Sequence, residues 1–198
     1  MSRVYGLTGS IGMGKSAVAA MIARAGVPLY DADAEVHRLQ GPGGKALPAI
    51  ERAFPGTTGP AGLDRAKLGA IVFAHPHRRR DLEEIMHPLV AAGRRAFLRR
   101  HAAYPLVVLD IPLLFEIHAE KELDGVIVVT APAWKQRKRV LARPGMTHRK
   151  FRAILGLQMP DALKRRKADH LIDTGTTFHR TREAVRALLA CLLRKPAG

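Results

Sequence analysis

Short apolar runs alternate with amphipathic stretches along this chain. The runs rich in valine, leucine and isoleucine predict five strands, at Arg3–Leu7, Val27–Tyr30, Leu106–Asp110, Val126–Thr130 and Leu171–Asp173. Strands separated by helical stretches are typical of an α/β sheet built from crossover units, in which neighbouring strands run parallel. The pattern therefore predicts an α/β fold with a central sheet.

A helix is predicted directly after the first strand. Val18, Met21, Ile22 and Ala25 follow one another at the i, i+3, i+4 and i+7 spacing that places side chains on one face of a helix. Gly26 comes next, at the position where helices commonly end in a left-handed residue. This helix would pack its apolar face against the sheet.

Two regions contain helical patterns but no convincing strand. Residues 34–104 form the first, and we expect a helical insertion between the second and third strands. Its last helix carries apolar residues at helical spacing, and Pro88 is expected to kink or divide that helix. The second region, residues 135–168, is helical and strongly basic. The remaining segments, 1–33, 105–134 and 169–198, would form the α/β core of a single domain.

Composition excludes several classes of protein. The chain has 198 residues, of which 47% are hydrophobic and 25% charged, which is ordinary for a globular domain. The longest apolar stretch, 105–117, is interrupted by Asp110, so no membrane span is expected. One cysteine rules out an internal disulfide framework. With no signal-peptide pattern at the start, we expect a cytoplasmic protein.

The charge balance leaves two classes of partner open. Lysine and arginine number 33 against 17 aspartate and glutamate, for a formal net charge of +16. Such a balance suits a nucleic-acid binder, or a site for a polyanionic small molecule in a basic surface. Aromatic residues make up only 5% of the chain, which provides few platforms for stacking bases. Nucleic-acid binding is therefore not the favoured interpretation.

The strongest motif spans residues 9–16, with the sequence GSIGMGKS, and fits G-x-x-x-x-G-K-[ST]. It lies between a predicted strand and a predicted helix, as a phosphate-binding loop does. Its glycines let successive backbone N–H groups point at phosphate oxygens, while the lysine contacts the β- and γ-phosphates and the serine hydroxyl binds Mg²⁺. The alternative is a glycine-rich turn with no ligand. The predicted ATP-binding residues are Gly9, Ser10, Ile11, Gly12, Met13, Gly14, Lys15, Ser16 and Ala17.

Carboxylates follow two of the predicted strands. Asp110 closes the third strand, where a second acidic residue can hold the metal through water or simply cap the strand. Asp31 and Asp33 follow the second strand. One of this pair could accept the proton of an attacking hydroxyl while the other caps the next helix or assists the metal; both could also be helix caps.

The chain resembles the dephospho-coenzyme A kinase family. The similar residues are the phosphate loop from Leu7 to Ser16, Asp31-Ala32-Asp33, His87-Pro88-Leu89, residues 112–116 (PLLFE), Gln158 and residues 168–173 (ADHLID). They occur in the family's order and spacing and cover nearly the whole chain. The phosphate loop is shared by many folds, but the other motifs together are far more selective.

The resemblance implies a fold and a reaction. The fold is a doubly wound five-stranded parallel sheet of the P-loop NTPase type, with an inserted helical substrate domain (34–104) and a helical lid (135–168). The reaction is transfer of the ATP γ-phosphate, with Mg²⁺, to the ribose 3′-hydroxyl of dephospho-CoA, the last step of coenzyme A biosynthesis. A monomer or small homo-oligomer is expected.

The resemblance also assigns roles to residues. Asp33 corresponds to the general base, Arg139 and Arg143 to lid arginines that approach the phosphates, and Lys15 completes the catalytic set. Ser16 and Asp110 are the expected metal-associated residues. The expected substrate-binding residues are Asp31, His87, Pro112, Leu113, Leu114 and Glu116. A packed or capping His87, an apolar core at 112–115 and a solvated helix face for each arginine remain the alternatives, and for Arg137 and Lys138 we favour the solvated face.

Departures from the family pattern raise one question about the nucleotide. Ala17 stands where the family usually has threonine, and Thr174 stands where it commonly has asparagine. If the loop at Thr174 touches the adenine, the preference for a nucleotide base would be relaxed. The rival interpretations are a different nucleotide kinase on the same sheet and an ATP-dependent nucleic-acid binder.

Overall fold

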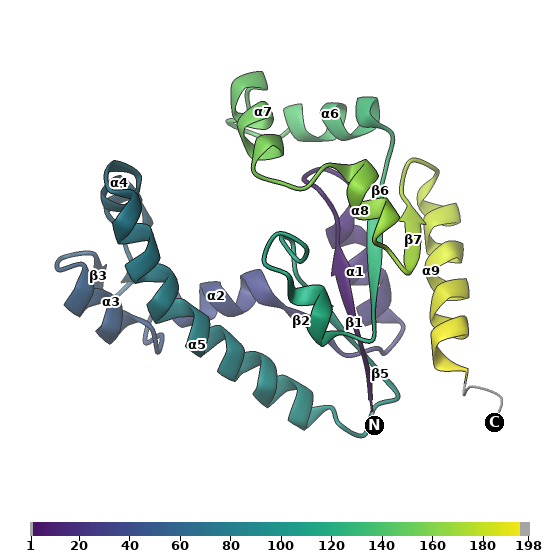
Figure 1. Cartoon of the computed structure of the whole chain (residues 1–198), viewed down its shortest axis with the longest axis horizontal. Coiled ribbons are helices and arrows are strands. Elements are labelled where there is room, and N and C mark those ends of the chain that lie inside the picture. The colour runs from purple at the N-terminus through teal and green to yellow at the C-terminus, as the bar shows by residue number, and fades with distance from the viewer. Residues whose placement is uncertain (1, 195–198) are drawn as a thin grey trace. The chain divides into compact units, whose positions relative to one another are not determined.

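The computed structural model describes residues 2–194; residues 1 and 195–198 lie outside the described residues. The chain divides into two compact units, one made of the residues up to Tyr30 and from His101 onward, the other of Asp31–Arg100 (Figure 1). Within residues 2–194, no helix combines the length and the apolar character needed to span a bilayer.

The first unit is built on a five-stranded sheet in the order β2-β5-β1-β6-β7. The strands are β1 (Arg3–Thr8), β2 (Leu29–Asp31), β5 (Leu106–Asp110), β6 (Gly125–Thr130) and β7 (His170–Asp173). β1 runs parallel to both β5 and β6, and β6 parallel to β7. The five strands predicted from the sequence are therefore confirmed, each within two residues of its expected bounds.

Helices α1 (Lys15–Arg24) and α9 (Phe178–Leu193) contact each other and pack on one face of this sheet (Figure 1). The apolar face predicted for α1 is buried: Val18 and Ile22 are fully enclosed in a cluster with strand residues and with α9. Near Gly6 the sheet is covered by the segment after β5, because Leu114 and Leu123 lie where a Cβ on Gly6 would be. Both faces of the sheet are thus buried, as parallel sheets require.

The basic region of the first unit forms three helices. They are α6 (Ala133–Leu141), α7 (His148–Gly156) and α8 (Asp161–Arg166), which lie between β6 and β7 in the chain. The segment between β5 and β6 has no α-helix and contains only a short 3₁₀ turn, η1 (Ala119–Glu122). Residues 135–168, expected to be helical, are therefore mostly helical.

The second unit is mainly helical, with α2 (Ala32–Gln40), α3 (Leu47–Ala53), α4 (Arg65–Ala74) and α5 (Pro76–Arg100). Its core is formed by Leu39, Ala46, Ile50, Phe54, Leu68 and Met86. A two-stranded hairpin, β3 (Thr58–Gly59) and β4 (Gly62–Leu63), lies in the region where no strand was expected. The sequence had given no strand pattern there because each strand is two residues long.

Helix α5 continues through Pro88, so the division expected at this proline does not occur. Proline removes one backbone hydrogen bond and crowds the preceding turn. The apolar residues on either side of it, Leu82, Ile85, Met86, Leu89 and Val90, all pack on the core of the second unit. Because helices in proteins derive most of their stability from such packing, this contact offsets the local cost.

Ile22 tests how much the first unit depends on the contact between α1, the sheet and α9. The side chain is fully buried, so Ile22→Ala should lower the free energy of unfolding by about 2–5 kcal/mol, through lost burial and the cavity left behind. Urea denaturation followed by circular dichroism measures this. Ile117→Ala is the matched control, because Ile117 is 63% exposed and should change stability by less than about 0.5 kcal/mol. Equal losses for both variants would contradict the assignment of the core.

Candidate active site

The phosphate loop joins β1, which ends at Thr8, to α1, which begins at Lys15. Gly14 is the residue before the helix and adopts a φ of +90°, a conformation that favours glycine. At Gly9 the constraint is space instead, because a Cβ there would lie 2.6 Å from the carbonyl oxygen of Val129 on β6. The glycines of the motif are therefore required by this structure as well as by the motif.

Three carbonyl groups of the loop are held by side chains from distant parts of the chain. The bonds run from Gln136 Nε2 to Ile11 O (2.8 Å), from Arg139 Nη1 to Gly12 O (3.4 Å) and from Thr174 Oγ1 to Met13 O (2.6 Å). Among the described residues, no hydrogen bond is donated by the N–H groups of Gly14, Lys15 or Ser16. The loop thus keeps consecutive donors available at the start of a helix, which is the arrangement that binds phosphate.

Asp110 lies beside this loop at the end of β5, because the parallel register pairs it with Leu7 of β1. It is 4% exposed, and its Oδ1 accepts a hydrogen bond from Lys15 Nζ. A buried carboxylate is stable when a cation and a hydrogen bond compensate it. Asp110 thereby holds the lysine ammonium at the loop, and the hydroxyl-bearing residue next to it, Ser16, is exposed.

A cavity of about 240 Å³ opens beside the phosphate loop. Arg139, Thr174 and Phe178 contribute to its wall, and the full lining is Gly14, Ala17, Met21, Arg139, Thr174, Thr176, Phe178 and Thr181. Phe178 is 54% exposed and provides an aromatic surface at the start of α9. Thr176 belongs to the loop that follows the last predicted strand, whereas Phe178 and Thr181 were not predicted from the sequence; their position directly after that loop was the signal that could have located them.

Thr174 contacts the phosphate loop in this structure. It is 5% exposed, donates to Met13 O, and accepts a hydrogen bond from Arg139 Nη1 at 2.8 Å, while its carbonyl accepts from Arg139 Nη2 at 2.7 Å. The threonine hydroxyl therefore anchors the loop as well as lining the cavity.

The two predicted lid arginines differ in their surroundings. Arg139 on α6 is engaged by Gly12 and Thr174, so its guanidinium supports the loop from the outside. Arg143 lies in the turn after α6, is exposed, and makes no side-chain hydrogen bond or ion pair among residues 2–194. Arg137 and Lys138 are exposed, as the solvated-face interpretation expects.

The segment after β5 places its expected substrate-binding residues in different environments. The carbonyl of Pro112 accepts a hydrogen bond from Thr8 Oγ1 at 3.0 Å, and Leu113 is 41% exposed. Leu114, expected in the same apolar wall, is fully buried against Gly6 and belongs to the core. Its placement supports the packing alternative for this residue.

Glu116 is likewise occupied by contacts within the protein. Its Oε1 accepts a hydrogen bond from the N–H of Met159 at 2.7 Å and lies 2.8 Å from Lys164 Nζ. Burial raises the pKa of this carboxyl, but the contacts with Lys164 and Met159 outweigh it, so the pKa lies below its ordinary value. As placed, Glu116 binds another part of the chain through Oε1, and the predicted substrate contact stays a prediction.

In the second unit, Asp31 and Asp33 play different parts. The helix α2 begins at Ala32, directly after Asp31, so the two aspartates do not lie on one extended strand, where residues two apart would share a face. Asp31 is the N-cap of α2 and accepts a hydrogen bond from the N–H of Ala34 at 2.9 Å. Asp33 lies in the first turn and is exposed, and its side chain has no hydrogen bond or ion pair among the described residues. His87 lies on α5 and is exposed.

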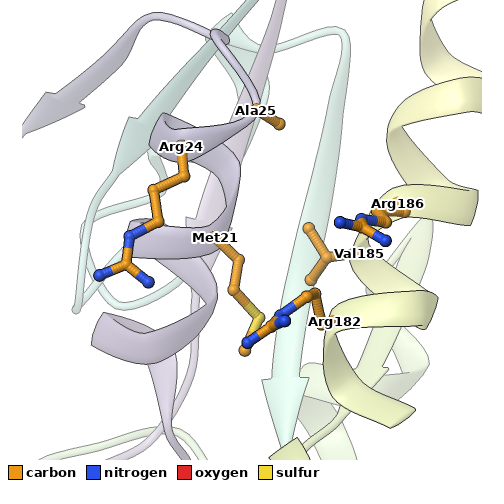
Figure 2. A pocket seen from close by; sticks show the side chains of 6 residues that line it. All are labelled: Met21, Arg24, Ala25, Arg182, Val185 and Arg186. Carbon is orange, nitrogen blue, oxygen red and sulfur yellow. The ribbon is translucent and has the colours of Figure 1, made fainter. Parts of the chain in front are cut away.

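A second cavity, of about 300 Å³, lies between the last turn of α1 and α9, at the opposite end of α1 from the phosphate loop. Figure 2 shows the guanidinium groups of Arg24, Arg182 and Arg186 around Met21 and Val185. All three arginines are exposed. None of the predicted site residues contributes to this cavity.

The sequence and the fold both match one family. The family model for dephospho-CoA kinase matches residues 3–179. A curated dephospho-CoA kinase of Novosphingobium aromaticivorans is 60% identical over 196 residues, covering 98% of each chain, and one of Mesorhizobium japonicum is 54% identical over 188 residues, covering 94% of each.

Solved structures agree in fold. A crystal structure of a Thermus thermophilus protein has a TM-score of 0.82 at 35% identity, covering 96% of this chain and 98% of the other. Dephospho-CoA kinase from Campylobacter jejuni has a TM-score of 0.72 at 24% identity, covering 96% of each chain. The similarity to the Campylobacter jejuni structure supports the doubly wound P-loop fold, and the sequence matches support the assignment to the family. The chain belongs to the dephospho-CoA kinase family.

Proposed function

We propose that this chain transfers the γ-phosphoryl group of ATP to the ribose 3′-hydroxyl of dephospho-CoA, giving CoA and ADP in the last step of coenzyme A biosynthesis. The observation that carries the proposal is the phosphate loop: three of its N–H groups donate no hydrogen bond within residues 2–194, and Asp110 holds Lys15. The identity of the acceptor is inferred from the family, because a relative 60% identical over 98% of its length is named a dephospho-CoA kinase.

ATP binds with its phosphates on the loop and its adenosine in the adjacent cavity of about 240 Å³. The helix start and the free N–H groups attract the phosphate oxygens, and the Lys15 ammonium meets the charge on the β- and γ-phosphates. Phe178 offers its ring to the base from one side of the cavity. Ala17 and Thr174 border the same space, so the two departures from the family pattern concern the nucleotide site.

The residues at the loop fit a Mg²⁺ ion that travels with ATP. Among the described residues, no cluster of three or more histidine, cysteine, aspartate or glutamate side chains could hold a metal alone. Mg²⁺ does not need one, because it keeps several waters and binds through one or two protein groups plus the substrate phosphates. The Ser16 hydroxyl and, through water, Asp110 would hold it. The ion supplies neutralisation of charge on the transferring phosphoryl group.

Asp33 acts as the general base in this proposal. Its carboxylate accepts the proton of the attacking hydroxyl, the hydroxyl oxygen bonds to the γ-phosphorus, and the bond to the β–γ bridging oxygen breaks to release ADP. Asp31 is committed to capping α2, whereas Asp33 is exposed and without a partner among the described residues. In the chain, Asp33 follows β2, and β2 neighbours β5, the strand that ends at Asp110.

The remaining assignments are part of the same proposal. Arg143 approaches the transferring phosphoryl group from the helical lid at 135–168, while Arg139 keeps the loop in shape. The helical region at 34–104 binds the acceptor and contributes His87. Pro112 and Leu113, from the segment after β5, are further acceptor contacts in the proposal. We also propose that the enzyme acts in the cytoplasm. The single cysteine, Cys191, is a free thiol, which is compatible with a reducing compartment.

The direct test is ADP release with Mg²⁺ and ATP, offering dephospho-CoA, adenosine, AMP or no acceptor in parallel. We expect turnover with dephospho-CoA only, with CoA as the product. Turnover with another nucleotide instead would favour the rival kinase, and acceptor-free turnover stimulated by nucleic acid would favour the ATP-dependent nucleic-acid binder. Nuclear magnetic resonance of the product locates the new phosphate at the 3′ position.

Lys15→Ala should lower kcat/KM for ATP by about 10²–10³ or more, because a fixed cation at the developing charge is lost. Steady-state kinetics measures the loss, and circular dichroism checks that removing the hydrogen bond between Lys15 and Asp110 has not unfolded the chain. Lys45→Ala is the control, since Lys45 lies outside the loop and should retain normal kinetics. Near-normal activity of Lys15→Ala would contradict the role of the phosphate loop.

Asp33→Asn should lower kcat by about 10²–10⁴, the usual contribution of a positioned general base, with a smaller effect on the KM for ATP. Asp64→Asn provides the matched control in the same unit: Asp64 caps α4, and asparagine caps a helix equally well. A loss of less than about threefold for Asp33→Asn would assign this aspartate a structural role instead.

Arg143→Ala should reduce kcat by about tenfold or more, because a cation that approaches the phosphoryl group is lost. The melting temperature should stay unchanged, because the exposed side chain makes no hydrogen bond or ion pair among residues 2–194. Arg137→Ala, on the solvated face of α6, is the comparison and should behave as the unaltered enzyme. Equal kinetics for the two variants would place Arg143 on a solvated face too.

A further inference from the structure

Lys164 is an unusual residue for an otherwise exposed, basic helix. It lies on α8 and its side chain is fully buried, whereas Arg165 and Arg166 on the same helix are exposed. A buried ammonium is costly unless a carboxylate compensates it. The compensating group is Glu116, whose Oε1 lies 2.8 Å from Lys164 Nζ. This pair differs in kind from a surface salt bridge, because breaking it leaves an uncompensated charge in the interior.

The same carboxylate oxygen also fixes the backbone that precedes α8. Glu116 Oε1 accepts the N–H of Met159 at 2.7 Å, so one atom holds both the helix and the segment leading into it. Its other oxygen, Oε2, is buried and has no hydrogen-bond partner among residues 2–194. The glutamate therefore attaches the segment after β5 to residues 158–164 through Oε1.

The segment that Glu116 holds contacts the phosphate loop through Gln158, the residue before Met159. Gln158 Oε1 accepts the N–H of Ile11 at 3.0 Å, and Gln136 Nε2 donates to the carbonyl of the same residue at 2.8 Å. Both polar groups of the Ile11 backbone are thus held by glutamine side chains. A continuous series of contacts runs from the Glu116–Lys164 pair through Met159 and Gln158 to the middle of the loop.

We propose that Glu116, paired with Lys164, is a positioning residue for the nucleotide site: it fixes residues 158–164 so that Gln158 holds Ile11 and keeps the phosphate loop in its binding geometry. The inference rests on the proposed role of this loop in binding ATP and extends it to residues that do not touch the nucleotide. A loop held in shape before the ligand arrives binds it more tightly, because less ordering is required on binding.

The test measures ADP affinity by isothermal titration calorimetry, which needs no acceptor substrate. Gln158→Ala should raise the dissociation constant for ADP about tenfold, the equivalent of one net hydrogen bond. Glu116→Gln should raise it by a similar factor. In steady-state kinetics both variants should show a higher KM for ATP with kcat changed less than threefold.

The double variant Glu116→Gln/Gln158→Ala separates positioning from general destabilisation. If Glu116 acts through Gln158, the double variant should bind ADP about as weakly as either single variant, so the two effects are not additive. Additive losses, about a hundredfold in total, would overturn the proposal, as would unaltered ADP binding by folded Gln158→Ala.

Two further variants guard against ambiguous results. Glu120→Gln is the matched control: Glu120 pairs with Lys167 at 3.3 Å, joining the same two segments without a link to Gln158, and its loss should leave ADP binding within twofold. If Glu116→Gln does not fold, because Lys164 is left uncompensated, the cycle is run in Glu116→Gln/Lys164→Met, which removes both charges. Failure of the proposed reaction alone would appear differently, as normal ADP binding without phosphoryl transfer.

Discussion

The structure of the nucleotide site depends on where the carbonyl groups of the phosphate loop are directed. A loop that offers its N–H groups to an anion must satisfy its carbonyls elsewhere, because an unpaired buried carbonyl is costly. Here the side chains of Gln136, Arg139 and Thr174 donate hydrogen bonds to the carbonyls of Ile11, Gly12 and Met13, respectively. All three come from segments more than a hundred residues further along the chain, so the loop acquires its geometry only when the whole first unit is assembled.

The end of β5 and the segment that follows it connect the parts of this site through two acids. Asp110, the last residue of β5, holds Lys15, and Glu116, in the segment after β5, holds Lys164. Between them the carbonyl of Pro112 accepts from Thr8, directly before the loop. In a chain with a formal charge of +16, two of the few carboxylates are thus buried against lysines. Their contribution is to orientation more than to stability, because desolvation offsets much of the attraction in a buried pair.

The arginines of the basic helical region serve separate purposes. Arg139 is hydrogen-bonded to Gly12 and Thr174 and therefore stabilises the loop, whereas Arg143 has a free guanidinium among the described residues. The distinction matters for the chemistry, since a fixed cation stabilises developing charge only if it can reach the phosphoryl group. Both arginines lie in the same basic stretch of the sequence, and only the hydrogen bonds of Arg139 in the structure distinguish their roles.

The sequence by itself determined the five strands, the first helix, the place of the phosphate loop between a strand and a helix, and the position of Asp110 at the end of its strand. It could do so because periodicity and a strand–loop–helix motif are local properties. It did not determine the continuity of α5 through Pro88, since that follows from packing on the core of the second unit. Nor did the sequence indicate the tertiary contacts that Leu114 makes with Gly6 and Glu116 with Met159 and Lys164. The anchoring side chains Gln136, Gln158 and Thr174 carry no periodic signal at all, because each contacts the loop across more than a hundred residues of chain, and only the assembled fold brings such groups together.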